Sequence, residues 1–235
     1  MRRLFALLLT LCLAPSAHAG AWARMPGQVF LSYSSNISSP VSALGTGRLL
    51  LDRYDSAYAE IGLGNRLTFG LDYGRGQYTR EGMAFLRYTL TRPDARWQLA
   101  VDLGAGQRQV DGLDDSDLWR VGLSLGHGFD LSPPDWIPGH LHGGWIAADA
   151  VAILDRITGQ TRWKLETTLG LHSGDRVDVI LQAMVEQWPG QQVAYAVNPS
   201  LVVRFGAATS VEIGARVAFD GQTRVGLELG LWHRF

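Results

Sequence analysis

The last twelve residues of the chain, 224–235, read Arg-Val-Gly-Leu-Glu-Leu-Gly-Leu-Trp-His-Arg-Phe. Apolar side chains fall at every second position from Val225 to Leu231, and small or polar residues fill the positions between them. A period of two predicts a β-strand with one apolar face. A soluble sheet hides that face in a core, whereas a barrel in lipid turns it outward and keeps polar side chains in the lumen.

The same alternation recurs along nearly all of the chain after residue 19. The alternating segments number twelve, an even number, as bacterial single-chain barrels have. We therefore expect an all-β fold, an antiparallel transmembrane β-barrel of about 12 strands. The predicted strands are 28–38, 54–63, 66–75, 82–92, 95–107, 116–129, 140–154, 160–172, 175–187, 192–205, 208–219 and 222–235.

The first nineteen residues have the pattern of an export signal. Arg2 and Arg3 precede the apolar run Leu4–Leu13, and Ala17-His18-Ala19 supplies the small-x-small cleavage pattern. We expect cleavage after Ala19, which leaves residues 20–235 as the barrel domain. The single cysteine, Cys12, would leave with the signal, and Leu11 before it argues against a lipoprotein.

Composition narrows the function classes. The formal net charge of −1 gives no basic field for nucleic acid. After the signal no apolar run is long enough for a membrane helix. If the chain spans a membrane, a closed barrel is the structure that satisfies its backbone hydrogen bonds.

The links between predicted strands indicate which end is which. Outer-membrane barrels have short periplasmic turns and longer outer loops. The links at 64–65, 93–94, 173–174 and 206–207 are short, and the alternate links at 39–53, 76–81, 108–115, 155–159 and 188–191 are longer. The short link at 220–221 and the Pro-rich segment 130–139 depart from this rule.

Aromatic residues fall near the predicted strand ends, where the interface of a bilayer favours Tyr and Trp. This distribution predicts two girdles, formed by Tyr33, Tyr73, Tyr88, Trp97, Trp119, Trp163 and Phe205.

The C-terminal strand resembles the last strand of bacterial outer-membrane β-barrel proteins. The resemblance is to this class as a whole and indicates an uncharacterised type within it. The resemblance is carried by Leu229, Leu231 and Phe235, while His233 departs from it. It implies a Gram-negative outer membrane, an assembly signal read by the barrel-assembly machinery, and contact with outer-membrane lipid and lipopolysaccharide. A soluble two-sheet periplasmic protein is the alternative fold.

Charged residues on the polar faces of the strands would lie in the lumen, and both signs are present. They either line a pore that sorts solutes by charge or pair with one another and fill a narrow interior. We favour the narrow lumen. The residues are Glu60, Asp72, Arg87, Asp102, Arg120, Lys164, Glu166, Asp178, Glu186, Arg204, Glu212, Arg216, Arg224 and Glu228.

No motif for chemistry stands out. Some twelve-stranded barrels cleave lipids with a His and a Ser two residues apart, but His172 and Ser173 are adjacent and so point to opposite faces. His140 and His142 are too few for zinc, and the spacing of Asp111, Asp114, Asp115 and Asp117 is not that of a calcium loop.

We therefore expect no catalytic, cofactor or metal site, and a channel-like or structural outer-membrane barrel with a narrow polar lumen. An outer-membrane enzyme acting on lipid or lipopolysaccharide is the alternative. A binding module that displays the loops 39–53 and 108–115 is the third hypothesis. The sequence leaves the oligomeric state and any transported solute open.

Overall fold

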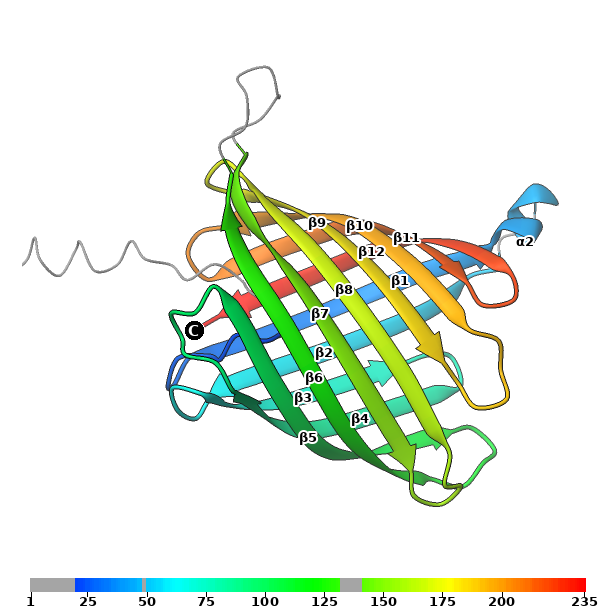
Figure 1. Ribbon diagram of the computed structural model, residues 1–235. Coiled ribbons are helices and arrows are strands. Elements are labelled where there is room, and N and C mark those ends of the chain that lie inside the picture. The colour runs from blue at the N-terminus through cyan, green and yellow to red at the C-terminus, as the bar shows by residue number, and fades with distance from the viewer. Residues whose placement is uncertain (1–19, 48–49, 132–140) are drawn as a thin grey trace, which may run out of the picture.

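A closed barrel of twelve antiparallel strands forms the protein (Figure 1), which confirms the predicted fold. The computed structural model describes residues 20–47, 50–131 and 141–235. The predicted export signal and most of the Pro-rich segment, with His140, lie outside the described residues. The strands are β1 (Val29–Pro40), β2 (Asp52–Gly62), β3 (Leu67–Arg75), β4 (Thr79–Thr89), β5 (Trp97–Val110), β6 (Ser116–Asp130), β7 (Leu141–Asp155), β8 (Thr161–Ser173), β9 (Val177–Gln187), β10 (Ala194–Phe205), β11 (Thr209–Phe219) and β12 (Thr223–Arg234).

Each strand pairs with its neighbours in sequence, and β1 closes the ring on β12. At the seam the Val29 amide donates to the Phe235 carbonyl at 3.2 Å, and the Phe235 amide donates to the Val29 carbonyl at 3.0 Å. Closure leaves no edge unpaired among the twelve described strands, as a bilayer requires.

The two ends of the barrel differ in the parts of the chain that lie there (Figure 1). One holds the start of β1 and the end of β12, and we call it the terminal end. The other holds the short helix α2 (Val41–Gly45), and we call it the α2 end. Among the described residues, no helix is long and apolar enough to cross a membrane.

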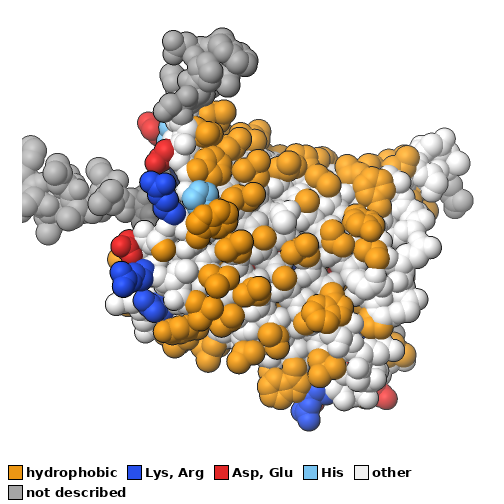
Figure 2. Space-filling view, in the orientation of Figure 1, with side chains coloured by type: hydrophobic (Ala, Val, Ile, Leu, Met, Phe, Trp, Pro, Cys, Tyr) orange, Lys and Arg blue, Asp and Glu red, His pale blue; other side chains and the backbone are white. Residues whose placement is uncertain are grey.

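The outer surface is apolar. Figure 2 shows hydrophobic side chains over the middle of the visible wall and charged side chains near its ends. The seven aromatic residues expected in girdles are all exposed to the outside of the protein, and so are Leu229, Leu231 and Phe235. His233, which departs from the C-terminal pattern, contacts Thr209 Oγ1 through its Nδ1 at 2.9 Å.

The predicted contrast in loop length is wrong at two links. The turn expected at 93–94 runs from 90 to 96, while the loop expected at 76–81 contains only residues 76–78. The side chain of Gln98 explains the wider turn, because its amide donates to the carbonyls of Arg92 and Ala95, at 2.9 and 2.8 Å. Loop length therefore does not assign the two ends.

Glycines on the interior face make room for large side chains of neighbouring strands. A Cβ at Gly170 would collide with the ring of Trp145, and one at Gly70 would collide with the ring of Phe85. Both rings are almost fully buried. The frequent glycines of the strands therefore let aromatic rings lie flat against the barrel wall.

Gly170→Val is expected to lower the free energy of unfolding by about 1–3 kcal/mol, the usual cost of overpacking. Gly128→Val is the matched control, because the nearest atom to a Cβ there is the Gly144 carbonyl oxygen at 4.0 Å. Urea unfolding in lipid vesicles measures both. Equal losses would show that the ring of Trp145 does not set the requirement for glycine.

Candidate functional site

The interior of the barrel is the candidate site. Residues paired across neighbouring strands face the same side of a sheet, and the register places all fourteen predicted lumen residues on the interior face. Whether they line an open pore stays a prediction.

The interior divides into two halves along the barrel axis. Toward the terminal end, Glu60 and Arg87 are buried, each 4% exposed. Toward the α2 end, the side chain of Asp72 is 47% exposed and that of Lys164 is 38% exposed. Because the wall is closed, such exposure means that these side chains border open space inside the barrel. We call the first half the floor and the second half the vestibule.

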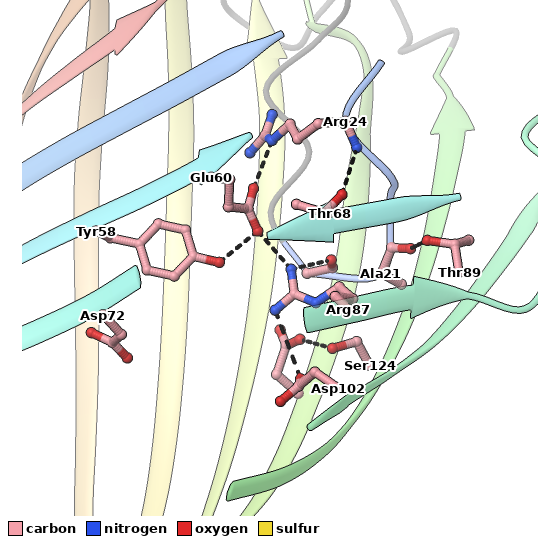
Figure 3. Close-up of polar contacts among 12 residues, drawn as sticks. Ala21, Arg24, Tyr58, Glu60, Thr68, Asp72, Arg87, Thr89, Asp102 and Ser124 are labelled. Atoms are coloured by element: carbon pink, nitrogen blue, oxygen red, sulfur yellow. Dashed lines mark hydrogen bonds and ion pairs between the residues drawn. The ribbon is translucent and has the colours of Figure 1, made fainter. Parts of the chain in front are cut away.

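A chain of alternating charges forms the core of the floor (Figure 3). Glu60 accepts hydrogen bonds from Arg24 Nε at 2.6 Å, from Arg87 Nη1 at 2.7 Å and from the Tyr58 hydroxyl at 2.6 Å. Arg87 lies 3.9 Å from Asp102, whose other oxygen accepts from Arg120 Nε at 2.7 Å. Each buried charge in this chain therefore lies beside an opposite one, as burial requires.

Arg24 belongs to a segment that the strand prediction left unassigned, residues 20–27. This N-terminal segment lies inside the barrel rather than outside it. The amide of Arg24 donates to Thr68 Oγ1 at 3.1 Å, and its guanidinium lies over the ring of Phe30, 4.6 Å from the centroid. The segment has no period of two, so alternation could not assign it a position. The sequence feature that could have drawn attention to it is the presence of Trp22 and Arg24 close after the predicted cleavage site.

A second buried group lies at the terminal end, on β8, β9 and β10. His172 Nδ1 lies 2.7 Å from Asp178 Oδ1, which also accepts from Arg204 Nη2 at 2.5 Å. A His–Asp pair would suit a lipid hydrolase if a hydroxyl nucleophile joined it. The hydrogen-bonded hydroxyls of Ser124 and Ser200 contact Asp149 and Glu212 instead. This group therefore gives the enzyme hypothesis no support.

Metal binding gains no support either. In the three described ranges, no group of three or more His, Cys, Asp and Glu side chains is arranged to hold an ion. His142 stacks on His172 with 5.7 Å between ring centroids.

The vestibule carries charges of both signs on several walls. Lys164 Nζ lies 3.0 Å from Glu166, and Arg120 lies 3.8 Å from Asp72. On β12 the carboxylate of Glu228 accepts from the Asn198 amide at 3.1 Å. These groups surround the open space in the middle of the barrel.

Three ion-pair groups lie around the mouth at the α2 end. Arg224 lies 3.1 Å from Asp52, and Arg108 lies 2.9 Å from Asp155. Arg162 on β8 bridges Glu81 on β4 and Glu186 on β9. Because β4 and β8 are four strands apart, the contact between Arg162 and Glu81 reaches across the interior.

Carboxylates slightly outnumber cationic side chains inside the described barrel. The cationic ones are Arg24, Arg87, Arg108, Arg120, Arg162, Lys164, Arg204, Arg216, Arg224 and Arg234. The anionic ones are Asp52, Glu60, Asp72, Glu81, Asp102, Asp149, Asp155, Glu166, Asp178, Glu186, Glu212 and Glu228.

Comparison with known proteins finds similarity at the level of structure. No family model matches the chain, and no curated protein sequence matches it. The NanC porin superposes with a TM-score of 0.60 at 8% identity, covering 86% of this chain and 98% of the porin. The KdgM porin superposes with a TM-score of 0.55 at 9% identity, covering 87% of this chain and 99% of the porin.

An outer membrane channel from Pseudomonas putida F1 gives a TM-score of 0.54 at 11% identity, covering 94% of this chain and 99% of the channel. Identities this low show a common fold, and function has to be argued from the site itself. The chain therefore has the barrel fold found in outer-membrane porins and channels.

Proposed function

We propose that this protein is a narrow outer-membrane channel for small polar solutes. The observation that carries the proposal is a closed wall, apolar on the outside, around a vestibule whose charged side chains border open space. An apolar outer band and a polar interior are the properties of a barrel that spans a membrane and conducts through its lumen. The similarity to porins and channels in fold supports the same conclusion.

We infer that the terminal end faces the periplasm of a Gram-negative cell. The predicted export signal would deliver the chain to the periplasm. From that side, the exposed face of β12 would present Leu229, Leu231 and Phe235 to the barrel-assembly machinery. The vestibule would then open outward, toward lipopolysaccharide and the medium, while the apolar wall contacts membrane lipid.

The balance of charges inside the barrel limits which solutes would pass. A polyanion needs an excess of cationic groups along its path, whereas here carboxylates are in slight excess. Opposite charges also lie side by side, as Lys164 and Glu166 do. The vestibule therefore suits small neutral, zwitterionic or cationic solutes, with a weak preference for cations.

Reversal potentials across a KCl gradient in planar bilayers test this proposal. We expect open events of the parent protein to favour K⁺ over Cl⁻. Glu228→Gln should reduce the permeability ratio about two- to fivefold, since one charge contributes less than about 1 kcal/mol in a water-like dielectric. Asp115→Asn, in the loop between β5 and β6, is the matched control and should leave the ratio unchanged. A strong preference for anions, or silence of every variant, would contradict the proposed function.

A further inference from the structure

The N-terminal segment crosses the lumen from one wall to the other. Pro26 forms a parallel bridge with Gly62 on β2. The Ala21 carbonyl accepts from Thr89 Oγ1 of β4 at 3.1 Å, and the Gly20 carbonyl accepts from Arg87 Nη1 of β4 at 2.9 Å. Gly20 itself lies beside Asp149 of β7. Since β2 and β7 are five strands apart in a ring of twelve, the segment spans the bore of the floor.

The barrel provides a fitted seat for this segment. Ala21 is fully buried, and barrel side chains satisfy the carbonyls of Gly20 and Ala21. The ring of Trp22 lies where a Cβ of Gly126 would be, and it packs against the buried cluster that contains Trp145 and Ile180. Polar satisfaction and close packing together indicate a specific bound position.

Asp149 marks where the segment begins. A Cβ on Gly20 would lie 3.0 and 3.1 Å from its two carboxylate oxygens. Its carboxylate accepts from the Ser124 hydroxyl, and within the described chain no cationic side chain lies within 4.0 Å of it. A carboxylate inside a barrel is costly without a partner of opposite charge. Cleavage after Ala19 would create an α-ammonium group on Gly20, next to Asp149.

We propose that the N-terminal segment is the gate of this channel, and that the α-ammonium of mature Gly20 holds it closed by pairing with Asp149. The proposal rests on the proposed channel function and on cleavage after Ala19. When the segment is bound in this position, it blocks the bore at the floor. The vestibule is then a cavity that is closed at the floor and open at the α2 end. Release of the segment toward the terminal end removes Trp22 and Arg24 from the bore and leaves Glu60 paired with Arg87.

Conductance of four refolded proteins tests the gate: residues 20–235, the same chain without residues 20–24, and Asp149→Asn in each background. We expect the complete chain to be mostly closed and the shortened chain to be mostly open. Asp149→Asn should raise the ratio of open to closed time about tenfold in the complete chain, as expected for a hydrogen bond to a charged group. In the shortened chain, Asp149→Asn should leave the ratio of open to closed time unchanged, because the α-ammonium group of Gly20 is missing.

Thiol labelling tests the same gate without relying on conduction. The chain from residue 20 onward contains no natural cysteine. Ala100→Cys places a thiol on the fully buried interior face of β5, in the floor. A water-soluble maleimide should label it at least tenfold faster after deletion of residues 20–24, or with Asp149→Asn if the deletion prevents folding. Ser56→Cys, on the half-buried interior face of β2 toward the vestibule, is the control and should react at one rate throughout.

The outcomes separate the two proposals. Faster labelling of Ala100→Cys with no conductance in any protein supports the seated segment and overturns the channel. Equal labelling with and without the segment overturns the gate, whatever the conductance. Equal effects of Asp149→Asn in both backgrounds, or a mature chain from outer membranes whose mass does not begin at Gly20, overturn the pairing of the α-ammonium with Asp149.

Discussion

Replacing Glu60 by Gln is expected to lower the free energy of unfolding by about 3–5 kcal/mol, the usual cost of removing one partner from a buried ion pair. The carboxylate of Glu60 lies between the guanidinium groups of Arg24 and Arg87, and all three residues are buried. Gln keeps the shape but not the charge, so two cations would face each other in the floor. Urea unfolding of the protein in lipid vesicles measures the loss.

Glu186→Gln is the matched control, because it makes the same chemical change at the mouth, where the side chain of Glu186 is 19% exposed against 3% for Glu60. Glu186 lies 3.5 Å from Arg162, which keeps Glu81 as a second partner. A partly exposed pair of this kind contributes about 1 kcal/mol or less. If both substitutions destabilise the barrel equally, burial of the charge chain at Glu60 is not what sets the cost.

Alternation in the sequence predicts the barrel because a period of two fixes the strand and its two faces at once. In the structure Glu60 and Arg87 lie on the interior side of the barrel. Alternation carries no information about which interior residues meet. The contact of Arg162 with Glu81 joins strands that are four apart, so it depends on the curvature and tilt of the closed sheet.

The N-terminal segment shows a second limit of prediction from sequence. Its position is set by Thr68, Arg87 and Thr89, which come from later strands, and not by any local pattern in residues 20–27. The turn after β4 shows the same limit on a smaller scale. Its width depends on the side chain of Gln98, which an inspection of turn residues alone does not consider.

Leu229→Arg is expected to reduce the folded fraction in lipid vesicles strongly. Leu229 is 59% exposed on the outer face of β12, midway along the strand, where it pairs with Ser35 of β1 and Ile213 of β11. Arg on the lipid face costs about 2–4 kcal/mol near the bilayer midplane. The neighbouring substitution Glu228→Gln is the control, because that side chain points into the polar interior, beside Asn198, and its replacement should leave folding nearly intact.

The two substitutions distinguish the two faces of β12, because positions 228 and 229 are adjacent and lie on opposite faces. A slip of one residue in the register of β12 would exchange every side chain between lipid and lumen. The folded fraction is read from the difference in gel migration between unheated and heated samples. If Leu229→Arg folds as well as the parent while Glu228→Gln fails, the faces are inverted or the sheet is not in a membrane. The assignment of all fourteen lumen residues would then fail with it, since they rest on the same alternation.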